Sequence, residues 1–134
     1  MPRPLRLLRL PGPYAVARLA PHDAIPPWAD GEGFVSISRT RGETSVTCLQ
    51  ARVPADVRHT GGWVALELLG PFAFDESGIL LRLIEPVSRA GIGVFVVSTY
   101  DSDHLLLQGE RFDEARRLLE AAGHALLDAA PPSA

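Results

Sequence analysis

Two short acidic turns carry most of the side chains in this sequence that could do chemistry. The first contains Asp75 and Glu76, and the second is the YDSD run at residues 100–103, which includes Asp101 and Asp103. A carboxylate forms strong, charge-assisted hydrogen bonds with an ammonium or a guanidinium group. These turns are therefore candidate sites for a ligand that carries a positively charged nitrogen.

The start of the helix predicted after the first turn offers the opposite charge. Ser77, Gly78 and Ile79 expose backbone N–H groups beside the positive end of the helix dipole, which suits a carboxylate, and Gly78 lets a ligand approach the backbone. A zwitterionic amino acid requires both at one place: hydrogen-bond donors for its carboxylate and hydrogen-bond acceptors for its ammonium group. The alternative is structural, because Asp75 or Ser77 could cap the helix and YDSD is ordinary turn chemistry. The residues alone leave both interpretations open.

No pattern of catalytic or metal-binding residues stands out. The sequence has no Lys and no Asn, which removes lysine Schiff-base chemistry and an asparagine oxyanion donor. Cys48 is the sole cysteine, and we expect it to be a buried strand residue. The histidines lie in separate elements without metal-ligand spacing, at His22, His59, His104 and His124. We therefore expect no catalytic residue, no metal site and no cofactor.

Composition is typical of a soluble globular protein. The chain has 134 residues, of which 46% are hydrophobic and 22% charged, and a net charge of −3. A nucleic-acid-binding protein needs a clustered basic face, which this balance does not supply. The apolar runs are shorter than the about 20 residues of a membrane span and do not form a signal segment. We expect a cytoplasmic protein that binds neither nucleic acid nor membrane.

A helix is predicted directly after the first acidic turn. From Ile79 to Val87 apolar residues recur at offsets of three and four, while Glu85 and Arg89 form an i,i+4 pair on the wet face. Pro86 interrupts this pattern and removes one backbone hydrogen bond, at a cost of about 3 kcal/mol unless the helix kinks. We keep the helix because the Glu85-Pro86 pair also belongs to the family resemblance given below.

Strands surround this helix. Residues 63–69 (WVALELL) predict a strand before it. Val94 to Val97 predict a second strand, which is either covered on both faces or a tightly packed inner strand. Residues 105–107 offer a partner strand across the YDSD turn. A second amphipathic helix runs from Phe112 to Ala122, and Gly123 is placed to cap its end. Residues 124–128 give a last strand.

The second half therefore has the order strand, helix, strand, strand, helix, strand, which is ferredoxin-like. The first half repeats this order imperfectly. It has strands within Leu5–Leu19, at Phe34–Thr40 and at Thr44–Leu49, and the last two form a hairpin through the turn at residues 41–43. Its connections are too short for full helices. His59 to Gly62 is interpreted as the linker between the halves.

The resulting expectation is an α+β protein of two tandem ferredoxin-like units with antiparallel sheets and helices on one face. Residues 1–60 form a degenerate first unit and residues 61–129 a complete second unit. Residues 130–134 form a Pro/Ala tail that we expect to be disordered.

The second unit also resembles a known family. The runs FDESGI, EP and STYDSDH, with a leucine-rich strand behind them, closely resemble the C-terminal ACT domain of the CASTOR-type cytosolic arginine sensors and of related small bacterial ACT-domain proteins. A weaker similarity extends to residues 34–49, so the resemblance covers most of the chain from Tyr14 to Asp128. It implies two tandem ACT-like units that bind an amino acid.

The resemblance also implies which residues contact the ligand. Those that match the sensors' contacts are Glu76, Ser77, Gly78, Ile79, Thr99, Tyr100 and Asp103. The sensors carry a cysteine where this chain has Ser77 and a second acidic contact where it has Gly91, so the sequence does not name arginine as the ligand. Their ligand lies between two copies of the second unit. By analogy, Asp113 and Glu114 of a second subunit would complete the site in a homodimer.

The sequence thus predicts a non-enzymatic sensor or allosteric regulator that binds an amino acid or a related small zwitterion. A regulated protein partner is expected but not identified. The alternative is an interaction module whose sheet edge binds a protein and which has no ligand. An unrecognised small-molecule enzyme is a third interpretation.

Overall fold

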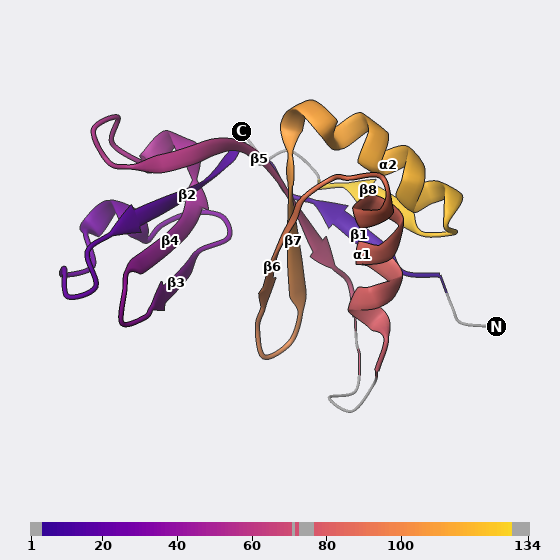
Figure 1. Cartoon of the computed structure of the whole chain (residues 1–134), viewed down its shortest axis with the longest axis horizontal. Helices are drawn as coiled ribbons and strands as arrows, with labels where there is room; N and C mark the ends of the chain where they lie inside the picture. The colour runs from indigo at the N-terminus through magenta and orange to yellow at the C-terminus, as the bar shows by residue number, and fades with distance from the viewer. Residues whose placement is uncertain (1–3, 71, 73–76, 130–134) are drawn as a thin grey trace. The chain divides into compact units, whose positions relative to one another are not determined.

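The structure is a computed structural model that describes residues 4–70, 72 and 77–129. It divides into two compact units (Figure 1). The N-terminal unit consists of residues 12–63, and the C-terminal unit combines the residues before 12 with those after 63. The expected tail at residues 130–134 lies outside the described residues.

The C-terminal unit has the ferredoxin-like order of strands and helices that the sequence predicts. Its elements are β1 (Arg6–Arg9), the end of β5 (His59–Leu68), α1 (Ile79–Arg89), β6 (Val94–Ser98), β7 (Asp103–Gln108), α2 (Phe112–Ala121) and β8 (Ala125–Asp128). Within this unit the strands are ordered β8, β1, β5, β7, β6. Both helices lie on one face of the sheet (Figure 1), so the sheet and the helices form two layers.

The core of this unit lies between those two layers. Leu83 and Val87 of α1 and Leu119 of α2 are fully buried against strand residues such as Leu66 and Leu105. The predicted apolar stripe of α1 therefore faces the sheet, and Glu85 and Arg89 form the predicted ion pair on the outside, with 2.6 Å between Oε1 and Nη2. Burial of the stripe is what holds α1 on the sheet.

The first strand of the chain lies in a different place from the one the sequence suggests. β1 pairs antiparallel with β5, with Leu7 opposite Leu68, and parallel with β8, with Leu7 opposite Leu126. It thus lies in the sheet of the C-terminal unit and not beside β2 in the first unit. Leu5 and Leu7 supply the physical reason, because both are buried in the core of the C-terminal unit.

The prediction that residues 94–97 form a strand that is covered on both faces or is a tightly packed inner strand is wrong. β6 is at the edge of its sheet and, among the described residues, pairs with β7 alone. Val94, Phe95, Val96 and Val97 are all half-buried. A continuous apolar run shows that a strand is favourable but does not show how many neighbours it has.

The N-terminal unit contains β2 (Tyr14–Leu19), β3 (Ser36–Arg39), β4 (Thr44–Leu49) and the first part of β5. β3 and β4 form the predicted hairpin, and β2 lies between β4 and β5. Two short 3-10 turns, Pro27–Ala29 and Gln50–Arg52, stand where a complete unit would have helices. Its core includes the buried Cys48 in β4, as the sequence predicts.

Residues His59 to Gly62 are part of a strand and not a linker. They begin β5, and Thr60 and His59 are opposite Val16 and Ala17 of β2. Gly62 has a φ of 74°, and the register between β2 and β5 shifts at this point. The pairing with β2 overrides the low strand propensity of the two glycines.

Both helices of the C-terminal unit end in the same way. In α1 the N–H groups of Gly91 and Ile92 donate to the carbonyls of Ser88 and Val87. In α2 the N–H groups of Gly123 and His124 donate to Glu120 and Leu119. This is the Schellman arrangement, which needs a left-handed residue, and Gly91 and Gly123 have φ values of 78° and 96°. The predicted cap at Gly123 is confirmed.

Pro86 lies inside α1, and its missing hydrogen bond is replaced from elsewhere in the fold. A residue with an N–H at position 86 would donate to the carbonyl oxygen of Arg82, one helical turn earlier. That oxygen instead lies 3.3 Å from Nε2 of His124. The other ring nitrogen of His124, Nδ1, accepts a hydrogen bond of 3.3 Å from the backbone N–H of Leu5. A neutral imidazole that accepts at Nδ1 carries its proton at Nε2, so His124 donates to Arg82.

We predict that this replacement makes Pro86 and His124 energetically coupled. His124→Ala removes the side-chain partner of the buried Leu5 N–H and of the half-buried Arg82 carbonyl, at about 1 to 3 kcal/mol each. In a Pro86→Ala background the new N–H can serve the Arg82 carbonyl, so the same His124→Ala change should cost about 1 to 3 kcal/mol less. Urea unfolding of the wild type, both single variants and the double variant measures the difference.

The exposed His22 provides the matched control, since His22→Ala should show no coupling to Pro86→Ala. Additive effects of Pro86→Ala and His124→Ala would contradict the replacement.

Candidate functional site

The turn between β6 and β7 is held by its own polar side chains. Across residues 99–102, the N–H of Thr99 donates to the carbonyl of Ser102 at 2.7 Å, and the N–H of Ser102 donates to Oγ1 of Thr99 at 3.1 Å. The hydroxyl of Ser102 also donates to the carbonyl of Leu68 at 2.8 Å. That last bond fixes the turn beside the end of β5, where the chain leaves the sheet toward α1.

Asp103 and Tyr100 differ in how the turn uses them. Oδ1 of Asp103 accepts a hydrogen bond from the hydroxyl of Ser98, the residue opposite it in the β6–β7 pair. Tyr100 is 81% exposed at the tip of the turn, and Asp101 is exposed beside it. The bond from Ser98 uses one of two carboxylate oxygens, so a turn role for Asp103 does not prevent it from binding a ligand.

α1 begins toward the same end of the sheet as this turn (Figure 1). Gly78 is the N-cap residue, with a left-handed φ of 79°, and its carbonyl accepts from the N–H of Arg82. Because the cap residue is a glycine, it has no side chain that could accept hydrogen bonds from the first N–H groups of the helix. Ser77, the residue before the cap, is exposed. Ile79 is the first helical residue. Asp75 and Glu76 lie outside the described residues.

Asp113 and Glu114 lie at the other end of the unit. β7 carries the chain away from the acidic turn, and α2 begins after that strand ends. Glu114 is bound by the guanidinium group of Arg111 at 3.0 and 3.1 Å, and Asp113 is exposed. Within one chain the structure therefore brings residues 77–79 and 99–103 to one end of the sheet and separates Asp113 and Glu114 from them.

Gly91 has a structural role that the sequence comparison did not suggest. It is the left-handed residue that closes α1, and a side chain there would meet open space but an unfavourable backbone conformation. The resemblance noted the absence of a carboxylate at this position. The geometry of this helix end favours glycine there.

His104 is buried on β7, close to the end of the sheet that carries the turn of residues 99–102. Burial lowers the pKa of its imidazole, and the carboxylates of Glu67 and Asp103 oppose that effect. Nε2 of His104 lies 3.7 Å from Oε1 of Glu67. His104 is therefore held neutral beside a site that the sequence predicts to be rich in carboxylates.

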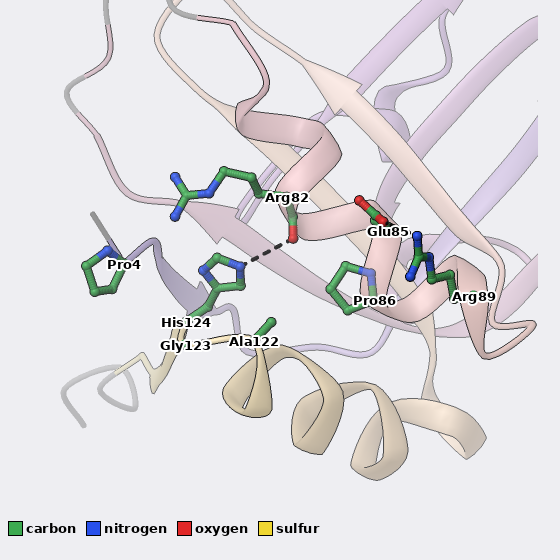
Figure 2. A pocket seen from close by; sticks show the side chains of 8 residues that line it. All are labelled: Pro4, Arg82, Glu85, Pro86, Arg89, Ala122, Gly123 and His124. Atoms are coloured by element: carbon green, nitrogen blue, oxygen red, sulfur yellow. Dashed lines mark hydrogen bonds and ion pairs between the residues drawn. The ribbon is translucent and has the colours of Figure 1, made fainter. Parts of the chain in front are cut away.

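A groove on the helical side of the C-terminal unit is a second candidate site (Figure 2). It lies between the outer flank of α1, the loop after α2 and Pro4, which is two residues before β1. Its lining residues are Pro4, Arg82, Glu85, Pro86, Arg89, Ala122, Gly123 and His124. Burial also lowers the pKa of His124, the hydrogen bond to the Arg82 carbonyl opposes this, and the nearby Arg82 guanidinium adds to it.

Sequence reasoning did not find this groove. Pro86 and Gly123 were each noticed as local signals, one as a broken rule and the other as a cap. His124 had been set aside because it lacks metal-ligand spacing. Pro86 and His124 are 38 positions apart in the sequence, so only the folded chain shows that they line one groove.

Some kinds of site are not found in the described part of the chain. No three His, Cys, Asp or Glu side chains there lie close enough together to hold a metal ion. Neither α1 nor α2 is long and apolar enough to cross a lipid bilayer.

Family models match both units of the chain. Residues 58–121 match the model for the ACT domain, and residues 12–56 match the model for a separate N-terminal domain. The boundary between the two matches falls at the beginning of β5. The matched ranges differ from the two structural units at β1, which lies before both matches but in the C-terminal unit, and at residues 58–63, which are in the ACT match but in the N-terminal unit.

Solved structures share the fold over nearly the whole chain. A protein of Agobacterium tumefaciens is 49% identical, with a TM-score of 0.92 over 99% of both chains. A protein from Vibrio cholerae, described as of unknown function and a possible transport protein, is 15% identical, with a TM-score of 0.72 over 90% of this chain and 91% of that one. The regulatory subunit of aspartate kinase from Thermus thermophilus is 6% identical, with a TM-score of 0.58 over 83% and 93%.

We predict that the two buried histidines make the fold sensitive to acid. The pKa values of His104 and His124 are lowered in the folded chain, so between the folded and unfolded values the unfolded chain binds more protons. Stability contributed by the neutral rings is complete above the unfolded pKa of about 6.5 and is lost as the pH falls through the lowered values. Urea unfolding at a series of pH values measures this.

His124→Gln keeps one donor and one acceptor but cannot titrate, so it should flatten the loss of stability below pH of about 6.5. The exposed His22→Gln is the matched control and should leave the pH curve as in the wild type. A curve that His124→Gln does not change would contradict the prediction for that residue.

Proposed function

We propose that this chain, which has an ACT domain at residues 58–121, is a non-enzymatic, cytoplasmic regulator that binds a free amino acid. The proposal places the ligand at the end of the C-terminal sheet where the β6–β7 turn lies beside the end of β5. Likeness to the regulatory subunit of aspartate kinase supports the fold assignment. The choice of ligand class depends on the local chemistry.

One observation carries the proposal. The bond from the Ser102 hydroxyl to the Leu68 carbonyl, 2.8 Å long, joins the acidic turn to the strand that leads into α1. Carboxylates of the turn and backbone N–H groups of residues 77–79 are thereby presented at the same end of one sheet. A ligand with both an ammonium and a carboxylate group matches that pair of features.

The proposed roles follow from charge. Backbone N–H groups at Ser77, Gly78 and Ile79 bind the α-carboxylate. Asp103 binds the ammonium group or a cationic side chain through the carboxylate oxygen that Ser98 does not use. Thr99 and Tyr100 shape the wall of the site, and Asp75 and Glu76 add acceptors from the segment outside the described residues.

The proposed assembly is a homodimer. Asp113 and Glu114 lie at the end of the sheet opposite the acidic turn, so a ligand in one chain cannot contact both sets. A second copy supplies them in the proposed site, and the Arg111 contacts hold Glu114 in a defined position. A regulated protein partner would respond to ligand binding.

A second candidate function is an interaction module without a ligand. The observation that favours it is the position of β6, an edge strand with a run of half-buried apolar residues. Its outer edge has backbone groups that an added strand from another protein could pair with. The two candidates differ in whether any free amino acid binds.

We predict that at least one of the twenty amino acids stabilises the fold. A ligand present at 100 times its Kd adds about 2.7 kcal/mol, which should raise Tm by roughly 8 to 14 °C for a chain of this size. Thermal unfolding with each amino acid at millimolar concentration tests this. Flat results for all twenty would favour the interaction module.

We predict that Asp103→Asn weakens binding of the best ligand by roughly 10- to 150-fold, because one charge-assisted hydrogen bond of about 1.5 to 3 kcal/mol is lost. Asn can still accept from Ser98 and keeps the turn, so Tm without ligand should barely change. Calorimetric titration of both proteins measures the difference.

The matched control is Asp56→Asn, which removes an exposed carboxylate of the N-terminal unit. It should bind as the wild type does. Equal affinities for Asp103→Asn and the wild type would remove Asp103 from the site.

A further inference from the structure

The chain at the start of β1 is held on both of its sides and by the ring of His124. On one side the N–H of Ala125 donates to the carbonyl of Leu5 at 2.9 Å, and on the other the N–H of Leu69 donates to the carbonyl of Arg6 at 2.9 Å. The N–H of Leu5 has a side chain as its partner, because it donates to Nδ1 of His124 at 3.3 Å. The start of β1 therefore depends on the protonation state of one imidazole.

The two ring nitrogens of His124 respond differently to an added proton. In the neutral ring Nε2 donates to the carbonyl of Arg82, 3.3 Å away (Figure 2), and Nδ1 accepts from Leu5. The added proton goes to Nδ1, since Nε2 already carries one. The bond to α1 is then kept, whereas two N–H donors meet at Leu5. Rotation of the ring does not relieve this conflict, because both nitrogens of an imidazolium are donors.

The charged groups near the ring do not favour the added proton. Three side chains of α1 line the groove beside the ring, Arg82, Glu85 and Arg89, and Arg89 binds the one carboxylate among them at 2.6 Å. The residues that adjoin the ring from the other segments do not ionise; they are Pro4, Leu5, Ala122 and Gly123. Charged residues farther along β1, α2 and β8 are the exposed Arg6 and the cluster of Arg116, Glu120 and Asp128. Burial and the Arg82 charge both lower the pKa of His124, so the proton binds only below the ordinary range of a histidine.

The end of β5 connects the start of β1 with the turn between β6 and β7. Leu69 bonds to Arg6 on one side, and the preceding residue, Leu68, accepts a hydrogen bond from the hydroxyl of Ser102 on the other, at 2.8 Å. Two consecutive residues thus join β1 to the turn. A loosened start of β1 would leave Leu69 without its strand partner, directly beside the residue that fixes the turn.

We propose that His124 is a pH-sensitive switch, whose protonation loosens the start of β1 and, through the end of β5, the β6–β7 turn. The neutral ring holds Leu5 and thereby the neighbouring bonds to Ala125 and Leu69. The protonated ring stays bound to α1 and no longer holds Leu5. A second consequence rests on the proposed function: because the turn is part of the amino-acid site, protonation of His124 weakens amino-acid binding. By linkage, a bound amino acid favours the neutral ring.

Hydrogen exchange tests the loosening of β1 without a ligand. NMR signals of the His124 ring give the pH at which it is protonated, and amide exchange is compared with the intrinsic rates above and below that pH. We expect the protection of the Leu5 amide to fall roughly 5- to 150-fold on protonation, because its hydrogen bond is lost. Protection of Ala125 and Leu69 should fall in the same direction, and amides in the middle of α1 and β7 should keep theirs.

A variant that cannot titrate provides the comparison. His124→Gln keeps one donor and one acceptor, so the protection of Leu5 should be the same at both pH values. The matched control is the exposed His22→Gln, which should lose protection as the wild type does. The wild-type exchange alone still tests the switch if His124→Gln does not fold.

Calorimetry tests the effect on the proposed site, with the amino acid that raises Tm most as the ligand. Wild-type affinity should be at least about fivefold lower below the pH at which His124 is protonated, and His124→Gln should lose less. His104 titrates in both proteins, so the difference between them is due to His124. Saturation with the amino acid should also move the titration of the His124 ring in the wild type to lower pH, as linkage requires.

Three results would overturn the switch. The first is unfolding of the whole chain before the ring is protonated, the second is unchanged protection at Leu5 and Leu69, and the third is a loss of protection that His124→Gln retains. Failure of every amino acid to bind would remove the proposed function and the effect on affinity, while exchange alone decides whether His124 holds β1. Binding with the same pH dependence in the wild type and His124→Gln would leave the proposed function intact and contradict its control by His124.

Discussion

The pair of hydrogen bonds at His124 is a buried polar constraint on the C-terminal unit, whose helices are otherwise held on the sheet by apolar burial. One bond reaches the start of β1 at Leu5, and the other reaches the middle of α1 at Arg82. His124 itself follows the Schellman end of α2 and precedes β8. A single buried ring therefore connects four elements, and it does so at the place where Pro86 leaves α1 without a donor. The neutral form of the ring is required for this, because protonation would place a donor at Nδ1 opposite the N–H of Leu5.

The sheet supports this arrangement by placing β1 between β5 and β8. β1 runs parallel to β8, so Leu5 and His124 come together at the end of the sheet where both strands begin. The same end holds the last residue of β5 and the turn that Ser102 fixes to it. The hydrogen bonds of His124 and the proposed amino-acid site thus lie at the same end of the sheet.

Particular residues show how far the sequence predicts this structure. The apolar stripe of α1, the end of α2 at Gly123 and the β3–β4 hairpin followed from local patterns, because periodicity and turn chemistry are local properties. β1 was placed in the wrong unit and β6 was given too many neighbours, because a strand pattern does not name its partners. The predicted order of strands and helices also indicates that the residues before α1 and those of the YDSD turn lie at one end of the sheet. It could not connect Pro86 with His124, since only the folded chain brings them together.

The central claim is that a free amino acid binds where the β6–β7 turn adjoins the start of α1. The most direct measurement is an NMR titration of the isotope-labelled protein with the amino acid that stabilises it most, followed at each backbone amide. The account predicts that the largest shifts occur at Ser77, Gly78, Ile79 and residues 99–103, and that residues 36–49 of the N-terminal unit do not shift. Shifts confined to other parts of the chain, with the amides of 77–79 and 99–103 unchanged at saturation, would contradict it.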